Sequence, residues 1–344
     1  MVFEIYTYGS GCLRINGEEV KRFRNTHGGR SLDYTLQVKA GVPYDIELDF
    51  EYFRSDAQLN FDIGFKQKVN IDASVACVKD ADVVVFAGGI SPLLEGEEMG
   101  VNLPGFRGGD RTDIELPAVQ RELIHALHRA GKKIILVNCS GSPIALEPET
   151  KNCEAILQAW YPGQAGGTAV ADVLFGDYNP GGRLPVTFYR NMSQLPDFED
   201  YNMTGRTYRY MTQQPLFPFG YGLSYTTFEY GNLSLTKEQI KVGEPLKLTV
   251  NVTNNGQRDG EEVVQVYLKK QDDAEGPGKT LRAFKRVRIP AGKSVEVVFD
   301  LNGKELEWWD AQSNTMRVCA GRYDVMVGKS SQDRDLQRRS FVIE

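Results

Sequence analysis

Residues 81–89 read ADVVVFAGG, a short run of almost wholly apolar residues that ends in two glycines. Such a run is typical of a strand that is buried on both faces of a parallel sheet. Helical and strand-like segments alternate around it, at residues 71–80 (helix), 116–132 (helix), 132–140 (strand), 155–163 (strand) and 164–177 (helix). This alternation predicts an α/β sandwich domain with a mostly parallel sheet over residues 68–190.

The helix predicted over residues 116–132 is amphipathic. Its spacing places Val119, Leu123 and Leu127 on one face, which is expected to pack on the sheet. Gly131 is the expected stop signal at its carboxyl end.

The chain on either side of the α/β domain has the period-two pattern of β structure. Residues 1–67 predict a partial antiparallel β unit with turns at Asn16-Gly17 and after Gly41. Residues 191–225 have little periodicity and many Pro, Gly and Tyr, which is typical of a bridging loop. Residues 226–344 contain short alternating strands at the spacing of an immunoglobulin-like or fibronectin type III-like β-sandwich. The chain is therefore predicted to be multidomain.

Composition excludes several classes of protein. No stretch approaches the roughly 20 apolar residues of a membrane-spanning helix, so no membrane partner is expected. The net charge is −6, and Lys and Arg are interspersed with Asp and Glu, so the basic surface that nucleic acid requires is lacking. Five scattered cysteines and three histidines have no metal-ligand spacing, so neither a metal nor another cofactor is expected.

A long loop follows the strand at residues 81–89, at the edge where open α/β sheets place ligands. It runs GISPLLEGEEMGVNLPGFRGGDRTDIE over residues 89–115, whereas such connections usually take about 2–6 residues. It contains Glu95, Glu97 and Glu98 beside a glycine. A carboxyl group on a mobile, glycine-flanked loop could protonate a leaving group if a neighbouring wall raised its pKa. The alternative is a merely solvated acidic loop, which composition alone favours.

Three other kinds of site lack the residues that they need. No G-x-G-x-x-G follows the strand at 81–89, which argues against a dinucleotide site. No G-x-S-x-G is present, and Ser140 has no plausible base among the three histidines. Glu122 and His125 form an E-x-x-H pair, but a carboxylate-bridged metal site needs a second copy of that pattern.

Residues 160–163 read WYPG and end the strand predicted over 155–163. They lie at the same sheet edge as the acidic loop, so Trp160 and Tyr161 could form a wall on which a sugar stacks. Packing between domains is the favoured interpretation of these aromatic residues.

Several segments, in this order, resemble glycoside hydrolase family 3, the family of β-glucosidases and β-xylosidases. They are GGISPLLEGEE (88–98), GGDRTDIELPAVQRELI (108–124), AWYPGQAGGTAVADVLFGDYNPGGRLPVTF (159–188) and YRYMTQQPLFPFGYGLSYTTFEY (208–230). Residues 252–269 and 289–301 resemble that family's C-terminal fibronectin type III-like domain. The resemblance covers about residues 68–344, and residues 1–67 look like the end of the protective-antigen-type β domain that some members carry.

The resemblance implies a retaining mechanism with two carboxylates. In this family an Asp on an N-terminal (β/α)8 barrel is the nucleophile, and a Glu on a loop of the α/β domain is the acid/base; the two carboxyl groups lie about 5–5.5 Å apart. The segment LLEGEE matches the acid/base loop of xylosidase-like members. This implies Glu95 as the acid/base, with Glu97 and Glu98 as alternates, and leaves the substrate-binding residues unknown. The implied partners are a β-linked oligosaccharide or an aryl glycoside and the barrel domain.

The 344 residues are accounted for without a barrel. The chain is therefore expected to be the C-terminal part of a longer, exo-acting β-xylosidase or β-glucosidase, and to be inactive alone. Its first residues, MVFEIYTYGSGCL, lack the pattern of a signal peptide. The parent is expected to be periplasmic or secreted, with its signal ahead of the barrel.

Two rival functions are weighed against this one. The first is a non-catalytic carbohydrate-binding or scaffolding protein that uses its β domains for adhesion. The second, weaker rival is a nucleotide-binding α/β protein, for which the phosphate loop is lacking.

Overall fold

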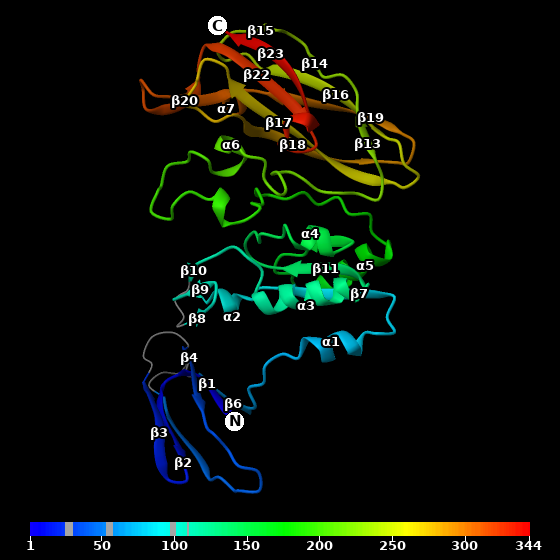
Figure 1. Ribbon diagram of the computed structural model, residues 1–344. Helices are drawn as coiled ribbons and strands as arrows, with labels where there is room; N and C mark the ends of the chain where they lie inside the picture. Colours follow the sequence, from blue (N-terminus) through cyan, green and yellow to red (C-terminus); the bar gives the residue numbers. More distant parts are fainter. Residues whose placement is uncertain (25–29, 53–57, 97–100, 109) are drawn as a thin grey trace. The chain divides into compact units, whose positions relative to one another are not determined.

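The computed structural model describes residues 1–24, 30–52, 58–96, 101–108 and 110–344 (Figure 1). These residues form two compact units, residues 1–141 with 151–158 and residues 142–150 with 159–344. In the described ranges, none of the helices is both long enough and apolar enough to cross a membrane.

The first unit begins with two small antiparallel sheets, in the strand orders β4–β1–β6 and β3–β2–β5. Apolar side chains of β1, β2 and β3 form their common core, namely Phe3, Ile5, Leu13, Ile15 and Phe23. Asn16 and Gly17 both have positive φ, as a type I′ turn between β2 and β3 requires. The strands are β1 (Val2–Tyr8), β2 (Ser10–Ile15), β3 (Glu18–Arg24), β4 (Arg30–Thr35), β5 (Ile46–Glu51) and β6 (Gln58–Gly64).

A parallel sheet in the order β12–β11–β7 follows in the same unit, as predicted. The register of β7 with β11 runs from Val83 opposite Lys133 to Gly89 opposite Cys139. The elements of this part are α1 (Ile71–Cys77), β7 (Val83–Gly89), α2 (Pro92–Glu95), β8 (Asn102–Leu103), β9 (Phe106–Arg107), β10 (Asp110–Arg111), α3 (Ala118–Arg129), β11 (Lys133–Cys139), α4 (Glu149–Asn152) and β12 (Ala155–Gln158).

The helix α3 lies where the sequence predicted it, but its packed face is rotated. Ile124 and Leu127 are 0% and 3% exposed, whereas Val119 is 43% exposed. The expectation that Val119 belongs to the packed face was therefore wrong. The buried residues of α3 are Ile124, Ala126 and Leu127, and the half-buried Gln120 lies one turn before Ile124 on the same side of the helix.

The strand β7 pairs with β11 on one side, and no other described strand pairs with it. Val83 and Val85 point to one face of this edge strand and are 45% and 52% exposed. Unpaired, apolar strand edges template association between chains. We expect the 344-residue chain to self-associate at high concentration in sedimentation velocity, and Val85→Lys to weaken this association.

Val42→Lys is the matched control, because Val42 is 48% exposed and lies outside the described strands. It should leave the association unchanged. A chain that sediments as a monomer at every concentration, or that responds equally to both lysines, would contradict the edge as the cause.

The second unit ends in a β-sandwich. One sheet has the order β13–β16–β14 with β19 also paired to β16, and the other has the order β15–β23–β22–β17–β18. Alternate residues of these strands, such as Leu248 and Val250 on β16 and Val264 and Val266 on β17, form one apolar core. The β structure comprises β13 (Phe228–Tyr230), β14 (Ser234–Leu235), β15 (Gln239–Ile240), β16 (Leu246–Asn254), β17 (Gly260–Lys270), β18 (Thr280–Ile289), β19 (Ser294–Leu301), β20 (Glu307–Asp310), β21 (Thr315–Val318), β22 (Gly321–Gly328) and β23 (Leu336–Ile343). The helices of this unit are α5 (Gly166–Phe175), α6 (Thr207–Tyr210) and α7 (Gly303–Leu306), with 3-10 turns at Met192–Gln194 and Asp333–Asp335.

Both faces of β17 are buried over residues 264–268, and residues within the segment 179–221 contact the face that points away from the core. We call this segment the strap. The Gln265 side chain donates to the Gly220 carbonyl at 3.0 Å, and the Tyr267 ring meets the Tyr208 ring edge-on at 5.8 Å. The strap and the sandwich therefore form one packed body.

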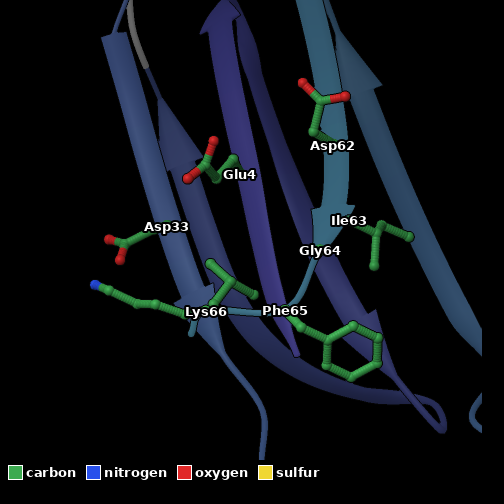
Figure 2. A pocket seen from close by; sticks show the side chains of 8 residues that line it. Glu4, Asp33, Asp62, Ile63, Gly64, Phe65 and Lys66 are labelled. Carbon is green, nitrogen blue, oxygen red and sulfur yellow. The ribbon is translucent and has the colours of Figure 1, made fainter. Parts of the chain in front are cut away.

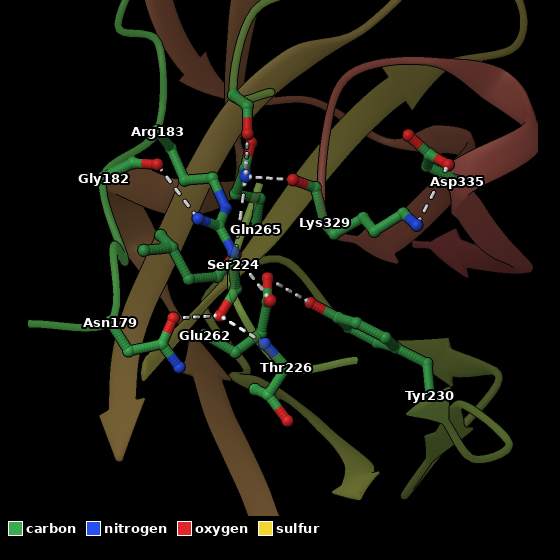
Figure 3. Close-up of polar contacts among 12 residues, drawn as sticks. Asn179, Gly182, Arg183, Ser224, Thr226, Tyr230, Glu262, Gln265, Lys329 and Asp335 are labelled. Carbon is green, nitrogen blue, oxygen red and sulfur yellow. Dashed lines mark hydrogen bonds and ion pairs between the residues drawn. The ribbon is translucent and has the colours of Figure 1, made fainter. Parts of the chain in front are cut away.

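A buried ion pair joins the start of the strap to β17 (Figure 3). Arg183 donates to Glu262 at 2.8 Å, and Tyr230 donates to the other carboxylate oxygen at 3.1 Å. The side chains of Arg183 and Glu262 are only 8% and 2% exposed. Burial raises the pKa of Glu262, and Arg183 and the Tyr230 hydrogen bond act against that rise.

Candidate active-site loop

The strand β7 ends at Gly89, where the long loop begins. Gly89 has a φ of +125°, and a Cβ there would lie 1.9 Å from the carbonyl oxygen of Cys139, so this position requires glycine. The next residue, Ile90, is 4% exposed and donates its N–H to the same Cys139 oxygen at 2.9 Å. The loop therefore leaves the sheet in a fixed direction.

Glu95 is the last residue of α2, a single helical turn in this loop. Ser91 caps the turn by accepting from the Leu94 N–H at 3.2 Å, and Pro92 occupies its first position. Gly96 closes it in the left-handed conformation, with its N–H donating to the Pro92 carbonyl at 2.9 Å. The glycine that suggested mobility is thus a helix cap, and the half-buried Glu95 lies on a capped turn rather than on an irregular loop.

Glu97 and Glu98, the alternates for the acid/base, lie outside the described residues. The loop resumes in a small antiparallel sheet of β8, β9 and β10. Asp113 accepts from the Glu115 N–H at 2.9 Å, and the Glu115 carboxylate accepts from Arg121 on α3 at 2.5 Å. These contacts tie the end of the loop to the helix that follows it.

Polar side chains at the carboxyl ends of β11 and β12 form a network that the sequence analysis missed. Asn138 donates to Gln158 at 2.7 Å and to Ser140 at 3.2 Å, and Gln158 donates to Ser140 at 3.1 Å. Asn138 and Ser140 are fully buried. The available signal was the polar residue that ends each of two apolar strands, ILVN and AILQ. The network holds together the carboxyl ends of β11 and β12, and β11 is the strand that pairs with β7.

Of the two aromatic residues of WYPG, Trp160 packs within the second unit, whereas Tyr161 is 38% exposed. The Trp160 ring meets the Phe188 ring edge-on at 6.1 Å, and Phe188 is 1% exposed. The contact joins two residues of one unit, so it does not test the packing between domains that the sequence favoured for Trp160.

An open hollow of about 270 Å³ lies on the sheet β4–β1–β6. Figure 2 shows Glu4, Asp33 and Asp62 beside it, and the register places Asp33 and Asp62 opposite Glu4 on the two neighbouring strands. Among the described residues, no group of three His, Cys, Asp or Glu side chains could hold a metal ion. A row of like charges across a sheet weakens strand pairing, and it is not by itself a binding site.

Comparison with known proteins identifies both parts of the chain. Residues 14–225 match the model of the glycosyl hydrolase family 3 C-terminal domain, and residues 262–331 match that of the fibronectin type III-like domain. The family model begins inside the N-terminal β unit, ahead of the α/β domain.

Two curated relatives match three quarters or more of the chain. A xylan 1,4-β-xylosidase from Xylanibacter ruminicola is 52% identical over 345 residues, covering 99% of this chain and 39% of the relative. A periplasmic β-glucosidase from Salmonella typhimurium is 38% identical and covers 76% of this chain and 34% of its own length.

A solved structure shares the fold. The β-glucosidase from Kluyveromyces marxianus in complex with glucose superposes on the whole chain with a TM-score of 0.76 at 28% identity, over 42% of its own length. The chain therefore spans about two-fifths of the length of the relatives that match it from end to end. The predicted fold and the resemblance inferred from the motifs are confirmed, and the chain belongs to glycosyl hydrolase family 3.

Proposed function

We propose that this chain supplies the general acid/base of a retaining, exo-acting β-glycosidase whose nucleophile lies on a separate (β/α)8 barrel. The observation that carries the proposal is the position of Glu95 on a capped turn beyond the carboxyl end of β7. That edge of a parallel sheet is where α/β proteins bind ligands. The motif LLEGEE and the membership of the family support the same residue.

In this mechanism the Glu95 carboxyl group acts twice. It first gives its proton to the glycosidic oxygen while the nucleophile of the barrel forms the glycosyl-enzyme, and the resulting carboxylate then takes a proton from the attacking water. The two carboxyl groups need a separation of about 5–5.5 Å for retention of configuration. Glu95 must therefore meet the barrel, and the substrate is bound where they meet.

The substrate class is a β-linked xylo- or gluco-oligosaccharide or an aryl β-glycoside. The relatives described above, a xylan 1,4-β-xylosidase and β-glucosidases, support this class. The higher identity to the xylosidase, 52% against 38%, favours xylosides. We place the parent enzyme in the periplasm or outside the cell, as the name of the periplasmic relative suggests. Fractionation of cells that express the parent gene tests this location.

The alternative function is non-catalytic carbohydrate binding or scaffolding. It is favoured by the N-terminal β unit and the sandwich, each of which has an apolar core of its own. A glycan-binding screen on the 344-residue chain separates the two functions, because an adhesion module binds glycans without the barrel.

The 344-residue chain alone should give no turnover of aryl β-xylosides or β-glucosides above background, because one carboxylate of a covalent mechanism provides no route to the glycosyl-enzyme. A chimera that joins this chain to the N-terminal portion of the Xylanibacter xylosidase should be active, with retained configuration in the product. Clear turnover by the purified 344-residue chain, or a folded chimera with no activity, would overturn the proposal.

A further inference from the structure

The side chain of Gln120, on helix α3, forms two hydrogen bonds with the backbone of Gly89. Its amide Nε2 donates to the Gly89 carbonyl at 2.8 Å, and its Oε1 accepts from the Gly89 N–H at 2.8 Å. One planar amide therefore satisfies both polar groups of one peptide residue, as a neighbouring strand would do.

Gln120 is itself held in place. It lies in the first turn of α3, and the helix is seated through Ile124 and Leu127, which are buried. The residue that precedes the helix by two positions, Leu116, is 2% exposed. The backbone that carries the Gln120 amide is therefore held in place by the packing of α3.

The backbone of Gly89 is also restricted on the side that faces β11. The Cys139 carbonyl oxygen occupies the space where a Cβ would stand and accepts the Ile90 N–H. Gly89 is therefore held between Gln120 and Cys139, and this pair of contacts sets the direction of the chain at the exit from β7.

The turn that carries Glu95 is half-buried at Leu94 and Glu95, and Gly96, which closes it, is buried. The start of the turn is fixed by its cap, because the Ser91 hydroxyl accepts from the Leu94 N–H at 3.2 Å. Only Ile90 and the cap Ser91 separate Gly89 from α2. The contact of Gln120 is consequently linked through a short and largely fixed segment to the carboxyl group six residues downstream.

We propose that Gln120 is a positioning residue for the acid/base Glu95. The inference rests on the proposed function. A displacement of about 1 Å at a reacting group can cost about 10²-fold in rate, so a small shift at Gly89 has a large effect on proton transfer. The nucleophile belongs to the barrel, so this contact acts on the acid/base and not on the nucleophile.

The test uses Gln120→Met, which keeps the length of the side chain and removes both hydrogen bonds. In the 344-residue chain, hydrogen exchange should accelerate at the Gly89 amide and over residues 94–96. In the chimera, kcat for glycosides with poor leaving groups should fall by about 10- to 100-fold. The KM, and the rate with a good leaving group that needs no protonation, should change by less than about threefold.

Glu122→Met on the exposed side of the same helix is the matched control and should change neither measurement. Gln120→Glu keeps an acceptor for the Gly89 N–H but opposes an oxygen to the Gly89 carbonyl. Gln120→Glu should show the same leaving-group dependence as Gln120→Met. If Gln120→Met does not fold, Gln120→Glu alone tests the inference.

Fast exchange at Gly89 with unchanged acid catalysis would overturn the inference, and so would a uniform loss of rate for all leaving groups. Glu95→Ala in the same chimera distinguishes the acid/base role of Glu95 from the positioning role of Gln120. If Glu95→Ala shows the acid/base signature and the Gln120 variants do not, only the positioning role is wrong. If Glu95→Ala lacks the signature, the assignment of Glu95 fails first.

Discussion

Glu95→Ala lowers kcat for xylosides or glucosides with poor leaving groups by about 10²–10⁴-fold in the chimera, because a positioned general acid contributes that much to the rate. Good leaving groups need little protonation, so their glycosylation step slows far less. The second step still lacks its base, and a glycosyl-enzyme accumulates. Added azide attacks without a base, restores turnover and gives a glycosyl azide of retained configuration. Leaving-group series and product analysis by NMR measure these effects.

Glu97→Ala and Glu98→Ala are the controls from the same loop and should show neither the leaving-group dependence nor the rescue by azide. If one of them shows both and Glu95→Ala does not, the acid/base lies two or three residues further along and the mechanism stands. If none of the three responds, the loop is a solvated acidic segment and the acid/base lies elsewhere.

Arg183→Met costs about 3–5 kcal/mol in the free energy of unfolding, since it leaves the carboxylate of Glu262 buried without its cation. Urea denaturation of the 344-residue chain, followed by a probe of the second unit, measures the loss. Arg288→Met is the control: the pair of Arg288 with Asp259 spans 3.2 Å but is 73% and 50% exposed, so its removal should change little. Equal losses in the two variants would contradict the argument.

The loss from Arg183→Met should depend on pH. Burial already raises the pKa of Glu262 above its ordinary value of 4.5, and removal of Arg183 raises the pKa further. A group whose pKa is raised on folding binds its proton more tightly in the folded state, so stability falls as the pH rises through that pKa. The destabilisation should thus be smaller near pH 4, where Glu262 is protonated in both states, and larger near pH 7. A penalty that is the same at both pH values would show that Glu262 is not its source.

Most secondary structure followed from local patterns. The run VVVFAGG became the parallel strand β7, and the dipeptide Asn16-Gly17 made the predicted hairpin turn. These features are encoded within a few residues, by apolar composition in one case and by tolerance of positive φ in the other. Motifs spread over 80–230 in the correct order then identified the family.

Other features could not be read from neighbours in the sequence. Val119 satisfied the helical period, but the neighbouring sheet selects which of two overlapping stripes is buried. Cys77 is exposed although its neighbours in the sequence are apolar. Gln120 and Gly89 are 31 residues apart, and only the packing of α3 against the sheet brings them together. The role proposed for Glu95 could not be read from its neighbours either, because the composition of the loop alone favours a solvated acidic segment.

Because the strap covers β17, the β-sandwich cannot be transferred to another protein as a unit without it. A sandwich excised at residue 226 would lose the partners that Arg183 and Gly220 supply to Glu262 and Gln265 of β17 from outside that boundary. A buried polar group that loses one of its partners in this way costs more free energy than an ordinary surface residue. Gene fusions and transplanted domains should therefore tolerate a cut ahead of residue 179 better than one at 226. The unit that can be transferred between proteins therefore comprises the strap as well as the β-sandwich.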